Sequence, residues 1–513
     1  MAGARNGHRV PRLLGAIRRA PAAAQLAIDA SLLLVPRHTR TLGSPGTRAK
    51  KMNSPTPSGQ AAPHSPPRQF QVSRRTFLRR VATAAAATGL PSWFVESQVL
   101  RAGEPAPAPA PNDRPGIALI GCGGMGKADL GNAANHGDIV AVCDVDSSHA
   151  AAAAQKFAAG GKVPAQYSDF RRLLERKDVH AVVNATPDHW HSLVNIAVAR
   201  AGKDVYAEKP LTLTIEEGRH VIEAVRKHGT VLQTGMQQRS SQRFRMASEL
   251  VRNGRIGGIK RAEVWLPAGM RDGPFREVPV PSTLDWDFWL GQAPRVGYMP
   301  QRCHTYFRYW YDYSGGTMTD WGAHHLDIVN WAVGLAAPRE VEGEELSEPV
   351  PGGYTAYADY DVRYRYANGI GIHVRTTRDD DIYGSSVNKD GQHNGIRFVG
   401  TSGWIWVNRH EITASDPDLL RTPLPEGSFR LPISKEHMTN FFDCVRSRQL
   451  PICDVEAGHR AATICHMGAI ALRTGRKLVW DAESEQFVGP HHVEANHYVS
   501  RRMRSPYDYG FAA

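Results

Sequence analysis

Polar side chains interrupt an otherwise apolar segment, SGGTMTDWGAHHLDIVNW, at residues 314–331. In a helix, successive residues are about 100° apart, so Asp320, His324 and Asp327 share one narrow face. Buried polar groups need partners, and this face therefore predicts a satisfied buried pair, a metal site or a substrate site. Histidine titrates near neutral pH unaided, so we favour proton transfer by His324, with Asp320 orienting its ring.

A second group of polar side chains follows the ends of predicted strands. The segments AVVNATPDHWH and DVYAEKP each begin as a short apolar strand and end in chemically useful residues. Ligands of parallel sheets bind beyond the carboxyl ends of the strands. The residues expected to contact a cofactor there are Thr186, Pro187, His191, Glu208 and Lys209, whereas His189 is expected to face solvent.

The segment GIALIGCGGMGKADL predicts a strand, a glycine-rich turn and a helix. Such turns allow pyrophosphate to approach the backbone at the helix N-terminus. The residues of this turn expected to bind the cofactor are Gly121, Gly123, Gly124, Met125 and Gly126. A second strand ends in Asp144, placed to accept hydrogen bonds from an adenosine ribose and to repel a 2′-phosphate. NAD is therefore favoured over NADP; Asp146 is the nearby alternative.

Strands alternate with helical patterns through the region that contains these motifs. This alternation predicts an α/β fold with a parallel, doubly wound sheet. We predict a disordered leader with a Pro/Ala-rich linker at 1–111, a dinucleotide-binding Rossmann domain at 112–236, a substrate and oligomerisation domain at 237–480, and a tail at 481–513.

Together, GxGxxG, ATPDHWH, EKP and GGTMTDWGAHHLD resemble the Gfo/Idh/MocA oxidoreductases over roughly residues 115–475. The resemblance implies a second, α+β domain with a large, open, mostly antiparallel sheet and a cleft between the two domains. It places Lys209 beside the nicotinamide and the reacting hydroxyl, Glu208 at the nicotinamide ribose, and Asp320 with His324 as the acid/base pair. His325 and Asp327 are expected behind them. Thr317 and Asp188 depart from the family pattern, which often has Gly and Asn there.

These residues predict oxidation of a sugar, glycoside or polyol hydroxyl, with hydride transfer to NAD and proton transfer to His324. The segment RCHTYFRYWYDY at 302–313 offers His304, Arg308 and Tyr309 as substrate ligands. Most of its aromatic residues, and Trp286 and Trp289, are expected to pack instead. His437 and His459 are interpreted as structural. No metal is expected, because the ligand spacings of zinc sites are missing.

The basic charge of the chain lies in its leader. The formal net charge is +12, yet residues 1–101 hold 16 Lys and Arg against Asp29 and Glu96, and the remainder is slightly acidic. This distribution argues against nucleic-acid binding. The twin arginines Arg74 and Arg75, followed by an alanine-rich stretch, resemble a twin-arginine export signal and predict a periplasmic protein that meets the export machinery transiently. Met52 is the expected true start.

Export constrains the chemistry, since free NAD is not expected outside the cytoplasm. The cofactor would be held tightly, and each hydride taken would be returned within the site. Two other functions stay open: a redox-neutral NAD-dependent glycoside hydrolase or lyase, and a non-catalytic dinucleotide sensor.

The remaining expectations concern assembly and cross-links. An open sheet face in the second domain would need a cover, which predicts a homo-oligomer. Cys122 and Cys143 are interpreted as buried thiols, and one disulfide among Cys444, Cys453 and Cys465 is left open.

Overall fold

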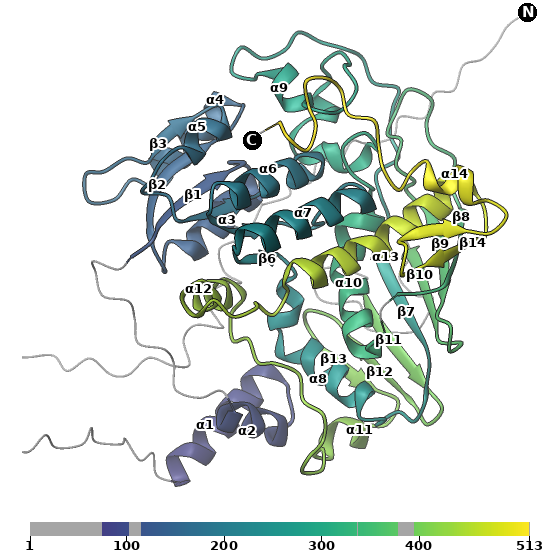
Figure 1. Ribbon diagram of the computed structural model, residues 1–513. Helices are drawn as coiled ribbons and strands as arrows, with labels where there is room; N and C mark the ends of the chain where they lie inside the picture. The colour runs from purple at the N-terminus through teal and green to yellow at the C-terminus, as the bar shows by residue number, and fades with distance from the viewer. Residues whose placement is uncertain (1–73, 102–113, 336, 378–393, 512–513) are drawn as a thin grey trace, which may run out of the picture. The chain divides into compact units, whose positions relative to one another are not determined.

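The computed structural model describes residues 74–101, 114–335, 337–377 and 394–511 (Figure 1). The chain divides into two compact units, Met1–Thr88 and Gly89–Ala513. The described part of the first unit is helix α1 (Arg74–Thr88), which contains the twin arginines. Met52, the expected start, lies outside the described residues. Across the described part of the chain, every helix is too short or too polar to cross a membrane.

A six-stranded parallel sheet forms the core of the first domain. Its strands are β1 (Gly116–Ile120), β2 (Asp138–Cys143), β3 (Ala165–Tyr167), β4 (Ala181–Asn184), β5 (Asp204–Ala207) and β6 (Leu232–Thr234). They are arranged in the order β3-β2-β1-β4-β5-β6. Strands β2 and β3 extend the sheet on one side of β1, and strands β4 to β6 extend it on the other side. Doubly wound folds bind their ligands where the strand order reverses in this way, here between β1 and β4. The predicted Rossmann topology is confirmed.

Helices cover both faces of this sheet. They are α3 (Gly124–Ala133), α4 (Ser147–Lys156), α5 (Phe170–Leu174), α6 (Asp188–Arg200) and α7 (Ile215–His228). A later helix, α12 (His437–Ser447), completes one side: Met438, Phe441 and Phe442 pack in one buried cluster with Ile117 and Leu119 of β1. The first domain thus includes residues beyond its predicted 112–236 range, because distant apolar residues fill the remaining face.

The second domain contains a nine-stranded mixed sheet in the order β13-β12-β11-β7-β10-β9-β8-β14-β15. Its strands are β7 (Ile259–Pro267), β8 (Glu340–Glu345), β9 (Tyr360–Arg365), β10 (Gly371–Thr377), β11 (Gly395–Gly400), β12 (Trp404–Val407), β13 (Ile412–Ala414), β14 (Leu478–Asp481) and β15 (Gln486–Val488). Among these pairings, β7–β10 is parallel and the other pairs are antiparallel. The predicted second fold, implied by the family resemblance, is confirmed.

Three helices lie against one face of this sheet: α8 (Gln242–Arg252), α10 (Thr317–Val333) and α13 (Val455–Thr474) (Figure 1). The polar stripe of residues 314–331 is therefore part of a buried helix, as its apolar faces predict. Helix α10 starts after Gly316 and ends at Gly334, which has a left-handed backbone (φ 74°) that glycine adopts without steric cost. The position of α10 sets where Asp320 and His324 point.

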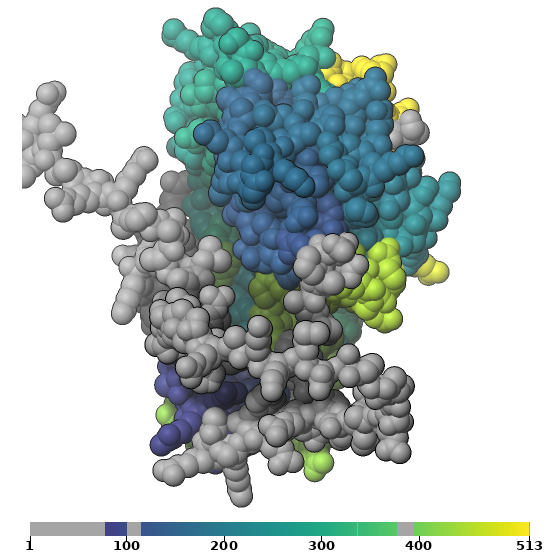
Figure 2. Space-filling view, turned by 90° about the vertical axis from the view of Figure 1, so that its left-hand side faces the viewer, coloured from purple at the N-terminus to yellow at the C-terminus, as the bar shows by residue number. Residues whose placement is uncertain are grey.

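A long segment between β7 and α10 carries α9 (Trp286–Leu290) and two short 3₁₀ helices, η5 (Pro300–Arg302) and η6 (His304–Tyr309). Trp286 and Trp289 stack with ring centroids 4.8 Å apart inside an aromatic cluster, as expected. The segment also reaches the end of β2: the Asp285 amide donates to the Val145 carbonyl at 3.0 Å. Figure 2, which faces the first domain, shows the teal surface of this segment along its upper margin.

Part of the predicted leader is folded rather than disordered. Helix α2 (Ser92–Arg101) belongs to the same unit as the two domains. The Trp93 indole donates to the Leu420 carbonyl at 2.9 Å, and the Arg245 guanidinium lies 5.5 Å from the centre of the buried Phe94 ring. The prediction of a disordered 1–111 leader is wrong for residues 92–101, because two adjacent aromatic side chains find a buried site.

The C-terminal tail also has a definite place. It passes over the first domain, where Tyr507 packs edge-on against Trp190 at 5.6 Å and Tyr509 stacks on His220 at 3.8 Å. Arg501 lies against the fully buried Glu217 of α7 at 3.5 Å. The tail therefore ties the first domain to the end of the chain.

All six cysteines lie among the described residues and are buried with free thiols. Cys122 and Cys143 pack in the cores of the first domain, as predicted. The disulfide left open among Cys444, Cys453 and Cys465 does not form.

Candidate active site

The glycine turn fits a pyrophosphate. Gly121 has φ 90°, and a Cβ there would lie 2.5 Å from the carbonyl carbon of Ala185; at Gly126 it would lie 2.0 Å from the Gly121 carbonyl oxygen. By contrast, nothing lies within 4 Å of the Cβ positions of Gly123 and Gly124, so this side of the turn is open. Gly123 provides no side-chain cap to α3, and the first N–H groups of a helix have no intrahelical partners. The turn, which includes Met125, therefore presents free donors to an anion.

Asp144 lies at the end of β2, beside this turn. One carboxylate oxygen accepts from the Cys122 amide at 2.7 Å and the other from the Asp146 amide at 2.9 Å. These bonds fix the carboxylate and leave further lone pairs for ribose hydroxyls. Asp146, the alternative, instead caps α4 by accepting from the Ser148 amide and hydroxyl at 3.0 and 2.6 Å. Of the two, Asp144 has the geometry of a ribose ligand.

The end of β4 holds its residues in a local network. The Thr186 hydroxyl donates to the Asn184 side chain at 2.8 Å, and Pro187 precedes the first turn of α6. His191 is buried, with its ring nitrogens 2.6 Å from the Pro210 carbonyl and 2.8 Å from the Thr186 carbonyl. Since both ring nitrogens have partners, His191 connects the ends of β4 and β5 rather than offering a nitrogen to the cofactor.

His189, expected to face solvent, is fully buried. Its Nε2 lies 2.9 Å from the Trp289 carbonyl, and burial lowers its pKa to about 3. The expectation is wrong because the 285–313 segment covers the start of α6, which the sequence of α6 does not reveal.

Lys209 and Asp320 bring the two domains together. The Lys209 ammonium forms an ion pair with the Asp320 carboxylate and lies 3.4 Å from the Asp320 carbonyl. Only 9% of the Lys209 side chain and 19% of the Asp320 side chain are exposed. Burial raises the pKa of Asp320, but Lys209 and Arg308 outweigh it and lower that pKa overall. The EKP loop and the polar stripe therefore face each other, as predicted.

His324 lies one turn after Asp320 but is not held by it. Asp320 bonds to Lys209 and Arg308, and the buried Nδ1 of His324 has no hydrogen-bond partner among the described residues. Burial, with the charges of Lys209 and Arg409, lowers the pKa of His324 well below its usual value. The predicted orientation of His324 by Asp320 is therefore wrong: two cations compete for the carboxylate. His324 is a neutral imidazole at neutral pH.

Two of the three predicted substrate ligands lie beside this group. The Arg308 Nε is 3.4 Å from the Asp320 carboxylate. Burial raises the pKa of Tyr309, and the negative charge of Asp320 adds to this effect.

His304 lies elsewhere. Its ring lies against that of His149, with centroids 4.4 Å apart and planes tilted by 46°, and its Nε2 is 3.6 Å from the Asp146 carboxylate, at the end of β2. The structure therefore places His304 at the end of β2, whereas Arg308, four residues later, lies beside Asp320. The expected grouping of His304 with Arg308 is not observed.

The residues expected behind the site do lie there. Asp327 forms a buried two-pronged ion pair with Arg239, at 2.6 and 2.8 Å. His325 is fully buried between Trp321 and Phe244, and burial lowers its pKa to about 3.

The two departures from the family pattern also find partners. Asp188 accepts from the Ser314 hydroxyl at 2.5 Å, and the Thr317 hydroxyl lies 2.8 Å from that of Tyr360. Asp188 and Thr317 thus each form a hydrogen bond with a residue of the second domain. His437 bonds to the Ser240 hydroxyl and the Thr234 carbonyl, a structural role as interpreted.

The sequence analysis missed three residues of this site: Gln237, Asp129 and Arg409. Gln237 donates to the Glu208 carboxylate at 2.9 Å. Asp129 of α3 is buried beside Glu208, and burial together with the Glu208 charge raises its pKa. Arg409, in the turn between β12 and β13, lies 4.7 Å from the centre of the Trp321 ring and acts on His324. A lone Asp, Gln or Arg outside any motif gives no signal before the chain folds.

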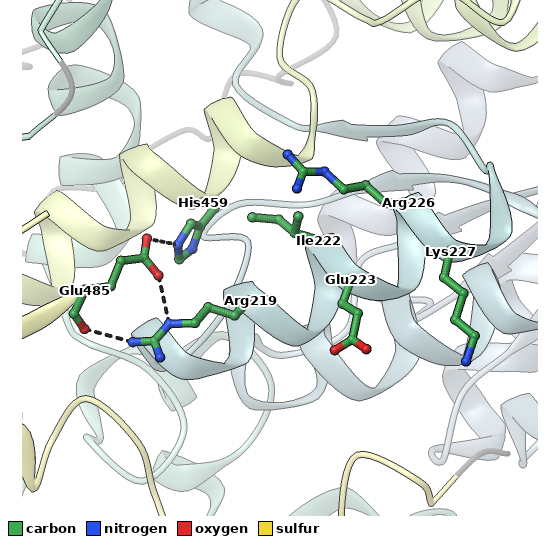
Figure 3. A pocket seen from close by; sticks show the side chains of 7 residues that line it. All are labelled: Arg219, Ile222, Glu223, Arg226, Lys227, His459 and Glu485. Atoms are coloured by element: carbon green, nitrogen blue, oxygen red, sulfur yellow. Dashed lines mark hydrogen bonds and ion pairs between the residues drawn. The ribbon is translucent and has the colours of Figure 1, made fainter. Parts of the chain in front are cut away.

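Two other features lie outside this group. Among the described residues, Asp146, His149 and His304 are the one trio that could hold a metal ion, with ligand atoms within 4.8 Å of one another. A surface pocket lies between α7 and Glu485 (Figure 3), but Glu485 already pairs with Arg219 at 2.8 Å and with His459 at 2.7 Å. None of the residues lining this pocket is a predicted site residue, and His459 is structural, as interpreted.

Curated relatives match parts of the chain. Inositol 2-dehydrogenase of Salmonella typhimurium is 33% identical over 143 residues, which is 28% of this chain and 41% of that protein. Levoglucosan dehydrogenase of Pseudarthrobacter phenanthrenivorans is 32% identical over 262 residues, 47% of this chain and 58% of that protein. The chain thus aligns with well under two thirds of the length of these relatives.

Solved structures share the fold. Aldose-aldose oxidoreductase from Caulobacter crescentus, complexed with glycerol, has a TM-score of 0.54 at 19% identity and covers 71% of this chain and 99% of its own. Levoglucosan dehydrogenase in complex with NADH and L-sorbose has a TM-score of 0.53 at 20% identity, covering 71% and 98%. At this identity the likeness shows the architecture alone.

Two family models match consecutive regions. One, "Oxidoreductase family, NAD-binding Rossmann fold", matches residues 116–236. The other, "Oxidoreductase family, C-terminal alpha/beta domain", matches residues 265–509, so that together they take in more than half of the chain. The chain therefore belongs to the Gfo/Idh/MocA oxidoreductase family.

Proposed function

We propose that this protein is an NAD-dependent oxidoreductase that acts on a hydroxyl group of a sugar, glycoside or polyol. The observation that carries the proposal is the buried Lys209–Asp320 ion pair, which joins the glycine-turn domain to α10 beside a neutral His324. The dehydrogenases among its relatives, named for inositol and levoglucosan, support a carbohydrate substrate. NAD, when bound, accepts the hydride, and a side chain of the protein must accept the proton of the substrate hydroxyl.

Each residue has a distinct task in this proposal. Asp320 holds the Lys209 ammonium in place, so that a substrate hydroxyl can accept a hydrogen bond from it. That bond stabilises negative charge developing on the oxygen. His324 is neutral, so a ring nitrogen can accept the hydroxyl proton. Because Lys209 disfavours a charged His324, the proton would have to pass on to solvent rather than rest there.

The test combines cofactor detection with substrate turnover. We expect the natively purified protein to contain NAD and its nicotinamide to become reduced when polyols or glycosides are added. Lys209→Met and His324→Gln should each lower the reduction rate by about 10²–10⁴-fold, whereas Lys227→Met, at an exposed position of α7, should not. Release of the aglycone without net reduction would favour the redox-neutral glycosidase. Bound NAD with no reaction, and no effect of Lys209→Met, would favour the sensor.

We also propose that the cofactor is tightly held. The 281–304 segment lies across the end of β2, where the Ser147 amide donates to the Thr283 carbonyl at 2.8 Å and the His304 ring lies 4.4 Å from that of His149. This segment would hinder departure of the adenosine half of NAD. His304→Ala should therefore speed NAD release from the purified protein, measured after rapid dilution, without unfolding it. An unchanged release rate would contradict this role.

Export and assembly complete the proposal. The twin arginines support delivery to the periplasm, which cell fractionation with Arg74→Lys and Arg75→Lys variants tests. A large open sheet needs a cover on each face, which supports a homo-oligomer through the second domain. Trp265 and Trp406, with ring centroids 5.3 Å apart on this sheet, are already buried within the protomer. Light scattering of the wild type measures the mass of the assembly, and a monomeric mass would contradict the proposal.

A further inference from the structure

Two arginines outside the family motifs lie beside the polar stripe of α10. Arg308 belongs to η6, and Arg409 to the turn between β12 and β13, about 100 residues later. Arg308 lies 3.4 Å from Asp320. The Arg409 guanidinium lies 4.7 Å from the centre of the Trp321 ring, and that ring packs edge-on against His324 with ring centroids 5.9 Å apart. A hydride transfer between NAD and a neutral sugar needs neither guanidinium, so their presence calls for a separate account.

Both guanidinium groups keep N–H donors that no hydrogen bond in the described ranges occupies. Arg308 keeps 30% of its side chain exposed and makes one further bond, from Nη1 to the Thr305 carbonyl at 3.2 Å. Arg409 is exposed, and its guanidinium lies over the Trp321 ring without an ion pair to any residue in the described ranges. A guanidinium has five N–H donors in a planar fork, which matches the two oxygens of a carboxylate.

The carboxyl groups nearby do not balance these cations. Asp320, the accessible carboxylate of the site, is already paired with both Lys209 and Arg308. Glu208 and Asp188 are buried and have their own partners, Gln237 and Ser314, and burial raises the pKa of both. The accessible positive groups therefore exceed the accessible negative ones, and such a site attracts anions.

We propose that the substrate is an acidic sugar: a glycoside whose ring carries a carboxylate, bound by Arg308 and Arg409. The guanidinium groups would fix the carboxylate, while Lys209 and His324 reach a hydroxyl of the same ring. The inference rests on the proposed function for the role of the site, but it predicts binding that can be measured without turnover.

The test uses matched pairs of methyl glycosides with gluco, galacto and manno configuration, each as the neutral sugar and as the uronic acid, with the 6-phosphate of each sugar as a second anion. Binding to the NAD-loaded protein is measured by calorimetry. For one configuration we expect the uronic acid to bind at least about 10-fold more tightly than its neutral partner. The preference should shrink at high salt, because solvent-accessible charges are screened.

Variants distinguish binding by these two arginines from a general effect of positive charge on the protein. Arg409→Gln should reduce the preference by about 5- to 10-fold, and Arg409→Lys should restore part of it. Arg421→Gln, at an exposed position of the same domain, removes an equal charge and should leave the preference unchanged. The melting temperature of each variant shows whether it folds.

The outcomes distinguish this inference from the proposed function. Equal binding of acid and neutral sugar in all three pairs overturns the acidic substrate, even if a neutral sugar reduces the bound NAD. Preferential binding of a sugar phosphate, with no preference for a uronic acid, overturns the carboxylate. A uronic acid that binds preferentially but never reduces the cofactor overturns the oxidoreductase and leaves the acidic ligand standing.

Discussion

At the scale of single residues, the site depends on how two cations share one carboxylate. Asp320 binds Lys209 and Arg308, and His324 is left without a partner for Nδ1 in the described structure. Burial, with the charges of Lys209 and Arg409, keeps His324 neutral. The site separates two tasks: a cation that polarises the substrate oxygen and a neutral ring that receives its proton.

This separation predicts an unusual pH dependence. A histidine base works only when deprotonated, and the pKa of His324 lies well below 6.5. The activity should therefore persist as the pH falls through 6.5 and be lost only at lower pH. Arg409→Gln removes one of the charges that depress this pKa, so the acid limb of kcat/KM should move to higher pH. Arg421→Gln should leave the limb in place, and a wild-type limb above pH 6.5 would contradict His324 as the base.

At the scale of elements, helix α2 illustrates how a short segment gains stability from its docking site. Phe94 is fully buried, and Trp93 donates to Leu420. Replacing a buried phenylalanine by alanine costs about 3–5 kcal/mol through lost burial and the cavity left behind. We expect Phe94→Ala to lower the free energy of unfolding by this order in chemical denaturation. Val99→Ala, at a position of the same helix that is 52% exposed, is the matched control.

The docking of α2 also bears on export. A protein cut after Phe94 would lose these contacts, so cleavage of the proposed signal should occur before Pro91. N-terminal sequencing of the protein recovered from the periplasm measures the position, and a mature chain starting after Phe94 would contradict the docked helix.

The elements also show what the sequence could reveal. GxGxxG, EKP and the Asp–His stripe predict where the cofactor and the proton-transfer groups lie, because each is a local pattern tied to a strand end or a helix face. The partner of Asp320 could not be predicted this way. Lys209 and Arg308, from segments distant in the chain, take the carboxylate that was expected to orient His324, and His304 lies beside Asp146 at the end of β2. Local spacing says nothing about such competition.

At the scale of the whole molecule, the two domains are held together by segments that return to the first domain late in the chain. Helix α12 fills one face of the Rossmann sheet, and the tail crosses α6 and α7 on the other. The cofactor site lies between elements far apart in sequence. Its geometry therefore depends on contacts at the very end of the chain.

Arg501 is the sharpest test of that dependence. Its guanidinium lies 3.5 Å from the carboxylate of Glu217, which is fully buried in α7, and Nη1 donates to the Asp312 carbonyl at 3.2 Å. Removing one partner of a buried ion pair leaves an uncompensated charge, at a cost of about 3–5 kcal/mol. Arg501→Gln should therefore lower the free energy of unfolding by this order and weaken NAD retention, whereas the neighbouring, exposed Arg502→Gln should do neither. The double variant Arg501→Gln/Glu217→Gln should recover part of the loss, because it removes the stranded charge. If Arg501→Gln were as stable as Arg502→Gln, the tail would be a passive covering of the first domain.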